Sequence, residues 1–206
     1  MHSDKNRLAT KEKEAATQGR IDVTHRRYRV IAGYQAETGV AIAYLGMRKI
    51  ETVRAGNVTE ALEALKGTLD RRFEHLRSER SGEVPSEAEY DEALQVLRAD
   101  VPEQSMALLL LLCRLPEVSA TLPELALRLG RSEPAVTTEA ARLGRRLGAL
   151  LDFAPDPEGL DRLLAPVLSF ARVSRIRPGS PQILRLRPEI VAPLRGLGQG
   201  EARALR

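Results

Sequence analysis

The chain has 206 residues, 43% of them hydrophobic, and a formal net charge of +4. This length allows one large or two small domains with substantial hydrophobic cores, and no apolar run approaches the ~20 residues of a membrane span. The N-terminal segment is charged rather than signal-like, and a single cysteine excludes an internal disulfide framework. These features predict a cytoplasmic protein without a membrane segment, in which Cys113 is buried as a small hydrophobe.

A tail and a small β-rich module are predicted for the first 78 residues. Residues 1–24 are charged, poor in apolar side chains and without periodicity, which predicts a disordered tail. Alternating apolar positions over residues 26–54 predict three strands, with a glycine-containing hairpin connection at 36–39. A helix capped by Asn57 follows, and its apolar stripe would cover one face of the sheet. Residues 25–78 therefore form a predicted β-β-β-α module, whose tyrosines pack or, as the alternative, form a platform for stacking bases.

A linker and a connecting helix are predicted for residues 79–102. Glycine and proline interrupt the polar segment that follows the first module. Ser86 and Glu89 then have the S-x-x-E spacing of a capping box, which begins a helix. The most apolar helix of the chain follows at Ser105–Leu115, and it is predicted to be the central helix of the second domain.

A short helix, a tight turn and a longer helix are predicted between Thr121 and Leu151. Thr121 and Ser132 suit N-caps, and Gly130 suits the left-handed end of the first helix. One face of the second helix is apolar and consists of Val136, Ala140, Leu143, Leu147 and Leu150. The opposite face consists of Thr138, Ala141, Arg142 and Arg145.

The spacing of Ala126, Gly130 and Val136 resembles the helix-turn-helix of bacterial transcription regulators, in which the second helix enters the major groove of DNA. Two packed amphipathic helices in an all-helical domain are the alternative. Farther along, two strand-like pieces between residues 172 and 187 are joined by a Pro-Gly-Ser-Pro turn. A β-hairpin placed after a recognition helix corresponds to a wing, and its arginines form either a phosphate-binding ladder or an exposed, solvated face.

The whole arrangement also resembles small bacterial proteins of unassigned function that have an N-terminal β-rich module. The matching pieces are Tyr28–Gly33, Glu89–Leu94 and Arg187–Ile190. The resemblance implies an α+β fold, in which the β-rich module precedes a mostly helical, winged-helix-like domain. We place that domain at residues 103–197 and a frayed tail at 198–206.

Positive charge is concentrated in the second half of the chain. Residues 1–104 carry 17 Lys and Arg against 18 Asp and Glu, whereas residues 105–206 carry 15 Arg against 10 acids. Every cation after Lys66 is arginine, whose guanidinium binds phosphates and guanine edges through two hydrogen bonds. A genomic preference for arginine codons explains the same bias equally well, so the charge asymmetry is the safer observation.

No catalytic chemistry is predicted. His2, His25 and His75 lack both the spacing of metal ligands and a nearby cysteine. Glycines occur singly at breaks rather than in a phosphate-cradling loop, and no serine has a visible base partner. We therefore expect no enzyme, no metal site and no cofactor.

The expected function is that of a cytoplasmic protein that binds double-stranded DNA as a transcriptional regulator, with a homo-oligomer or protein-partner surface on the N-terminal module. The residues expected to contact DNA are Arg131, Ser132, Thr138, Arg142, Arg145, Arg146, Arg175, Arg177, Arg185 and Arg187. The alternative is a non-enzymatic adaptor or inhibitor, linked to a phage or mobile element, that reuses the winged-helix shape for protein–protein interaction. DNA binding is favoured if the arginines of helix 132–151 and those of the hairpin lie on one face of the domain. The adaptor function is favoured if these arginines are scattered and an apolar patch is exposed.

Overall fold

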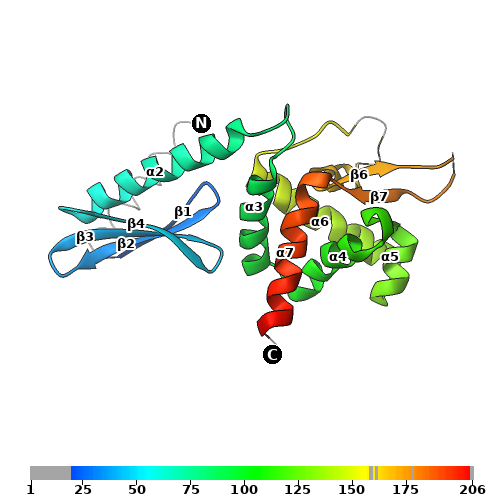
Figure 1. Ribbon diagram of the computed structural model, residues 1–206, viewed down its shortest axis with the longest axis horizontal. Coiled ribbons are helices and arrows are strands. Elements are labelled where there is room, and N and C mark those ends of the chain that lie inside the picture. The colour runs from blue at the N-terminus through cyan, green and yellow to red at the C-terminus, as the bar shows by residue number, and fades with distance from the viewer. Residues whose placement is uncertain (1–19, 158–159, 161, 178, 205–206) are drawn as a thin grey trace. The chain divides into compact units, whose positions relative to one another are not determined.

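The computed structural model describes residues 20–157, 160, 162–177 and 179–204, with side chains described as far as residue 198 (Figure 1). The fold is mixed α+β, and the chain divides into two compact units, Met1–His75 and Leu76–Arg206. Within the described residues, no helix combines the length and the apolar character that crossing a membrane requires.

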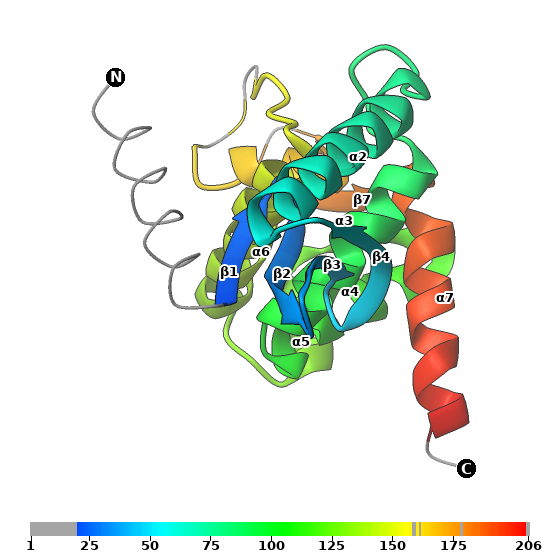
Figure 2. The ribbon, with the colours of Figure 1, turned by 90° about the vertical axis from the view of Figure 1, so that its left-hand side faces the viewer.

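The first unit is an antiparallel sheet with one helix across it. Its strands pair in chain order and are β1 (Arg20–His25), β2 (Tyr28–Gln35), β3 (Thr38–Leu45) and β4 (Arg48–Ala55). The following helix, α2 (Val58–Ser78), runs over one face of the sheet (Figure 2). As predicted, Asn57 caps this helix, because its side-chain oxygen accepts a hydrogen bond of 2.9 Å from the backbone N–H of Glu60.

Small side chains allow the helix to lie close to the sheet. Ala32 of β2 and Ala41 and Ala43 of β3 are at most 1% exposed on the covered face. A Cβ on Gly39 would lie 2.1 Å from the carbonyl carbon of Asn57, so only glycine fits where β3 passes the start of α2. The larger Ile42, next to Ala41 and Ala43 in β3, points to the uncovered face and is partly exposed.

The predicted β-β-β-α module therefore has four strands rather than three. Residues 20–24, which the sequence assigned to the tail, belong to β1, where Val23 pairs with Val30. Only Ile21 and Val23 alternate as apolar residues in this strand, which is too short a pattern to identify a strand without its partner. The rest of the predicted tail, residues 1–19, lies outside the described residues.

The second unit combines helices with a small antiparallel sheet. Its elements are α3 (Glu87–Asp100), α4 (Glu103–Arg114), the 3-10 turn η1 (Pro116–Val118), β5 (Ser119–Thr121), α5 (Leu122–Leu129), α6 (Glu133–Leu151), the 3-10 helix η2 (Ala165–Ser169), β6 (Ala171–Ser174), β7 (Ile183–Leu186) and α7 (Pro188–Ala204). The three strands form one sheet in the order β5-β7-β6. As predicted, α4 is central, since Leu108, Leu109 and Leu112 are fully buried in the core.

Two predicted segments of this unit differ in part from the structure. The connecting helix predicted within residues 79–102 is present as α3, but it belongs to the domain core, because Tyr90, Leu94 and Leu97 are fully buried there. The predicted frayed tail begins too early at residue 198, because α7 continues to Ala204. In both places an amphipathic segment gains its packing from distant helices, which residue composition alone does not reveal.

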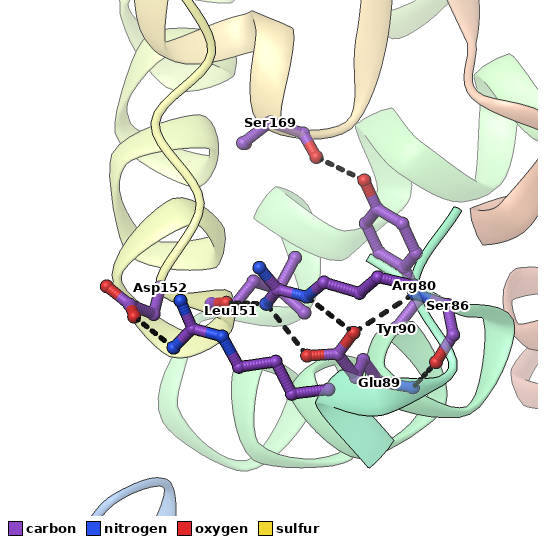
Figure 3. Close-up of polar contacts among 8 residues, drawn as sticks. Arg80, Ser86, Glu89, Tyr90, Leu151, Asp152 and Ser169 are labelled. Atoms are coloured by element: carbon purple, nitrogen blue, oxygen red, sulfur yellow. Dashed lines mark hydrogen bonds and ion pairs between the residues drawn. The ribbon is translucent and has the colours of Figure 1, made fainter. Parts of the chain in front are cut away.

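A buried ion pair attaches the start of α3 to the end of α6 (Figure 3). Arg80 donates two hydrogen bonds, of 2.9 and 2.8 Å, to the Glu89 carboxylate, and a further one to the carbonyl of Leu151. The side chain of Arg80 is 8% exposed and that of Glu89 is not exposed. The predicted capping box of Ser86 and Glu89 is present, so the same carboxylate also caps α3.

A second buried contact attaches α3 to η2. The Tyr90 hydroxyl donates a hydrogen bond of 2.6 Å to the Ser169 carbonyl (Figure 3). Burial raises the pKa of Tyr90 well above its usual range, so the phenol remains a proton donor at any physiological pH. Together with the ion pair, this bond fixes the position of the segment after α6 relative to α3.

Candidate nucleic-acid interface

The turn between α5 and α6 has the predicted geometry. Thr121 caps α5, because its hydroxyl oxygen accepts a hydrogen bond of 3.3 Å from the N–H of Glu124. Gly130 follows α5 with φ 63° and ψ 34°, the left-handed conformation that favours glycine. Ser132 occupies the N-cap position of α6, but its side chain makes no capping hydrogen bond. Ser132 and Arg131 are instead both exposed at this turn.

The predicted outer face of α6 is exposed, with one exception. Thr138, Arg142, Arg145 and Arg146 are exposed, while Val136, Ala140, Leu143 and Leu147 are at most 1% exposed. Ala141 was expected on the outer face but is fully buried. The segment after α6 folds back and brings η2 against the helix, which widens its buried side beyond the predicted stripe.

Two glycines of α6 allow that close approach. A Cβ on Gly144 would lie 2.2 Å from the carbonyl oxygen of Pro166, and one on Gly148 would lie 2.9 Å from the carbonyl oxygen of Phe153. The Ser169 hydroxyl donates a hydrogen bond of 2.9 Å to the carbonyl of Gly144. Sequence reasoning missed this contact, although two glycines four residues apart inside a helix are the signal that indicates it.

The arginines of α6 differ in their partners. Arg142 forms an ion pair of 2.7 Å with Glu139 and donates a hydrogen bond of 2.6 Å to the hydroxyl of Ser105 in α4. Arg146 forms an ion pair of 2.7 Å with Asp100 at the end of α3. Within the part of the chain that the structure describes, the guanidinium of Arg145 has no hydrogen-bond or ion-pair partner.

Electrostatics connect the turn to this cluster. Burial raises the pKa of Glu139, but hydrogen bonds from Arg142 and Ser105 and the charges of Arg142 and Arg131 outweigh burial and lower it below its usual value. Arg131 of the turn therefore lies within electrostatic range of Glu139. The predicted residues of the turn and of α6 thus lie at exposed positions of one helix and its N-terminal turn.

The predicted hairpin is present, and its arginines fall into two groups. Arg175 and Arg177 are exposed in the connection between β6 and β7, which projects beyond the helices of this unit (Figure 1). The hydroxyl of Ser180 closes this connection by accepting a hydrogen bond from the N–H of Arg177 and donating one to its carbonyl. Pro178 of the predicted turn lies outside the described residues.

The other two predicted arginines of the hairpin have partners inside the unit. Arg185 forms an ion pair of 2.6 Å with Glu117. Arg187 donates a hydrogen bond of 2.9 Å to the carbonyl of Leu168, and its guanidinium lies 5.2 Å from the centroid of the Phe153 ring. Arg187 is therefore only partly exposed and links the start of α7 to the segment after α6, so its predicted phosphate contact would compete with these internal partners.

The arginines of α6 and those of the strands lie near opposite ends of α4. Arg142 contacts Ser105 in the first turn of α4, whereas Arg185 contacts Glu117 just beyond its last residue. Ten helical residues separate the two ends by about 15 Å. The ten predicted DNA contacts therefore do not form a single cluster.

Two further observations concern metal ligands and the single cysteine. Among the described residues, no three His, Cys, Asp or Glu side chains gather as metal ligands would. As predicted, Cys113 is buried, with 6% of its surface exposed, and this burial raises the pKa of its thiol. Comparison of the chain with protein-family models, curated proteins and solved structures gives no match.

Proposed function

We propose that the second unit binds double-stranded DNA as a transcriptional regulator, with α6 in the major groove. The observation that supports this most is the order of its elements. The order α4, β5, α5, α6, β6 and β7, with a left-handed turn at Gly130 and a sheet ordered β5-β7-β6, is that of a winged helix-turn-helix. In that arrangement, the second helix of the motif reads bases and the hairpin contacts the backbone.

The exposed face of α6 has the side chains that this role requires. Its 19 residues extend over roughly 28 Å, so only part of the helix needs to enter the groove. Arg145 lacks a described partner and is the proposed base-reading residue. Arg142 and Arg146 are each 47% exposed in their ion pairs. Such pairs contribute only about 0–1 kcal/mol, so phosphates can replace the carboxylates at little cost.

A protein-interaction adaptor is the second candidate, and it is favoured by the separation of the α6 arginines from those of the strands and by specific exposed side chains. Leu127 on α5 is 83% exposed and Ile176 in the hairpin connection is 76% exposed. Both apolar side chains lie on elements that would approach DNA in the first proposal, and a protein partner would bury them instead.

The test uses the full chain and fluorescent duplexes from its own genomic neighbourhood, each paired with a scrambled duplex. Two double variants are compared, Arg142→Ala with Arg145→Ala on α6 and Arg175→Ala with Arg177→Ala on the hairpin. The matched control, Arg114→Ala with Arg162→Ala, removes the same charge from two other exposed positions.

We expect the α6 variant to lose the preference for the cognate duplex, because base contacts carry the sequence information. The hairpin variant is expected to weaken binding to both duplexes alike and to reduce the slope of log K against log salt by about 1.8, at ~0.9 per phosphate contact. The control should match the unmodified protein. Equal affinities for all proteins, or no binding, would refute the proposal and favour the adaptor.

A further inference from the structure

A cavity of about 590 Å³ lies at the base of the hairpin, within the second unit. It lies among the end of α4, η1, β7 and the first turns of α7. The residues that line it include three arginines, Arg172, Arg185 and Arg195, and the apolar Leu115, Leu186 and Val191. None of these six residues belongs to α6, so this pocket is separate from the proposed DNA-reading face.

Positive charge in this pocket exceeds the available carboxylate. Arg172 of β6 and Arg185 of β7 are directly opposite each other in the strand register, a position in which like charges repel. Glu117 pairs with Arg185 at 2.6 Å. Within the described residues, neither Arg172 nor Arg195 forms an ion pair with a carboxylate, and the thiol of Cys113 beside Arg195 donates its hydrogen bond of 3.7 Å to the carbonyl of Val191. The pocket thus has guanidinium groups in position to take an anion.

The backbone beside these groups has an uncommon conformation. Glu117 and Val118 have φ values of 54° and 47°. The left-handed region is uncommon for residues other than glycine, and it is a genuine outlier for a β-branched valine. Such conformations gather at binding sites and persist only where the surrounding structure holds them. Here they position Glu117 against Arg185 and place Val118 in the wall of the pocket.

We propose that this pocket binds a small organic anion that consists of a carboxylate joined to an apolar ring or chain. The planar guanidiniums of Arg172 and Arg195 suit the two oxygens of a carboxylate. The apolar floor suits the hydrocarbon part, and the volume lies within the ~300–1,000 Å³ of small-molecule sites. This site does not depend on the proposed DNA binding.

The experiment is calorimetric titration of the full chain with 2-naphthoate, in the absence of DNA. Two ligand controls separate the parts of the recognition, since 2-naphthalenemethanol lacks the charge and acetate lacks the ring. The variants are Arg172→Gln and Arg195→Gln. Arg175→Gln is the matched control, because it removes an exposed arginine from the same hairpin but outside the pocket.

We expect saturable binding of one naphthoate per chain, and a Kd that rises about tenfold or more in each pocket variant, since each loses a charged hydrogen bond. The Arg175→Gln variant should keep its Kd within about twofold, and both ligand controls should bind at least tenfold more weakly than naphthoate. Circular dichroism confirms folding, and the two pocket variants are independent, so one that fails to fold leaves the other decisive.

Three results would overturn the proposal. The first is the absence of saturable naphthoate binding. The second is an unchanged Kd in a folded pocket variant, or an equal loss in Arg175→Gln. The third is binding of acetate or 2-naphthalenemethanol as tight as that of naphthoate. Because no duplex is present, none of these results bears on whether α6 binds DNA.

Discussion

Replacing Gly144 with alanine tests whether η2 holds α6 in position through close backbone contact. The added Cβ would lie 2.2 Å from the carbonyl oxygen of Pro166 and 2.5 Å from its carbonyl carbon. Real Cβ atoms essentially never approach closer than 3.0 Å, so that oxygen would have to withdraw by about 0.8 Å. The obstacle is backbone, and no side-chain rotation relieves it. The segment from Ala165 to Ser169 must therefore move.

The expected magnitude combines two opposing effects. Alanine stabilises an open helical position relative to glycine by about 0.5–1 kcal/mol. Overpacking of a tightly packed region costs about 1–3 kcal/mol, and an immobile backbone obstacle favours the upper part of that range. Gly144→Ala should therefore lower the free energy of unfolding by about 1–2 kcal/mol. Gly196 in α7 is the matched control, because a Cβ there meets no atom within 4 Å.

Thermal unfolding of the full chain, followed by circular dichroism, measures both variants. For a unit of this size, 1 kcal/mol corresponds to a change in Tm of roughly 3–4 °C. Gly144→Ala should lower the Tm by about 3–8 °C, whereas Gly196→Ala should raise it by about 2–4 °C. If the two variants shifted the Tm in the same direction by similar amounts, the contact between Gly144 and η2 would not be a structural constraint.

Three further predictions concern other contacts of the second unit. Glu89→Ala leaves the buried guanidinium of Arg80 without this carboxylate, so it should lower the free energy of unfolding, measured with urea, by about 3–5 kcal/mol. A loss below about 1 kcal/mol would contradict the burial of the pair. Gly130→Val should lower the free energy of unfolding by about 1 kcal/mol or more, because valine is strained at a positive φ. A Cβ at this position meets no atom within 4 Å, so no steric clash adds to this effect. An unchanged Tm would show that the turn does not lie at Gly130. The lowered pKa of Glu139 stabilises the fold at neutral pH, and this contribution is lost as pH falls through 4.5 and below. Glu139→Gln should therefore lower the free energy of unfolding by about 1 kcal/mol or less at pH 7, and by less than that at pH 3. A larger loss at pH 3 than at pH 7 would contradict this prediction.

Local chemistry explains which parts of the fold the sequence could predict. Asn57, Ser86 and Gly130 each mark a helix boundary through hydrogen bonds or dihedral angles within a few residues. The exposed face of α6 follows in the same way from a periodicity of 3.6 residues. The partner of Arg80 at the end of α6, Leu151, is 71 residues away along the chain, and no local pattern indicates such a contact.

The arginines of the candidate site show the same limit. Sequence reasoning treated Arg175, Arg185 and Arg187 as one group, either a phosphate-binding ladder or a solvated face, because they share a residue type and a hairpin. In the structure, Arg175 is exposed, whereas Arg185 pairs with Glu117 and Arg187 contacts Phe153. Which role an arginine has depends on partners that the fold brings from elsewhere, so composition identifies the residue type but not the interface.

The separation of the two proposed sites along α4 determines how they influence each other. An anion in the pocket cancels positive charge about 15 Å from the arginines of α6, which exceeds the Debye length of ≈ 8 Å at 0.15 M salt but not the 30 Å at 0.01 M. Leu108, Leu109 and Leu112, which lie between the two ends of α4, are fully buried and cannot shift without repacking. Naphthoate should therefore weaken the preference for the cognate duplex, which the arginines of α6 supply, by less than about twofold at 0.15 M salt and by more at 0.01 M. Duplex titrations with and without saturating naphthoate at both salt concentrations measure this coupling. A large effect that is independent of salt would show instead that β7 transmits a conformational change from the pocket to the hairpin.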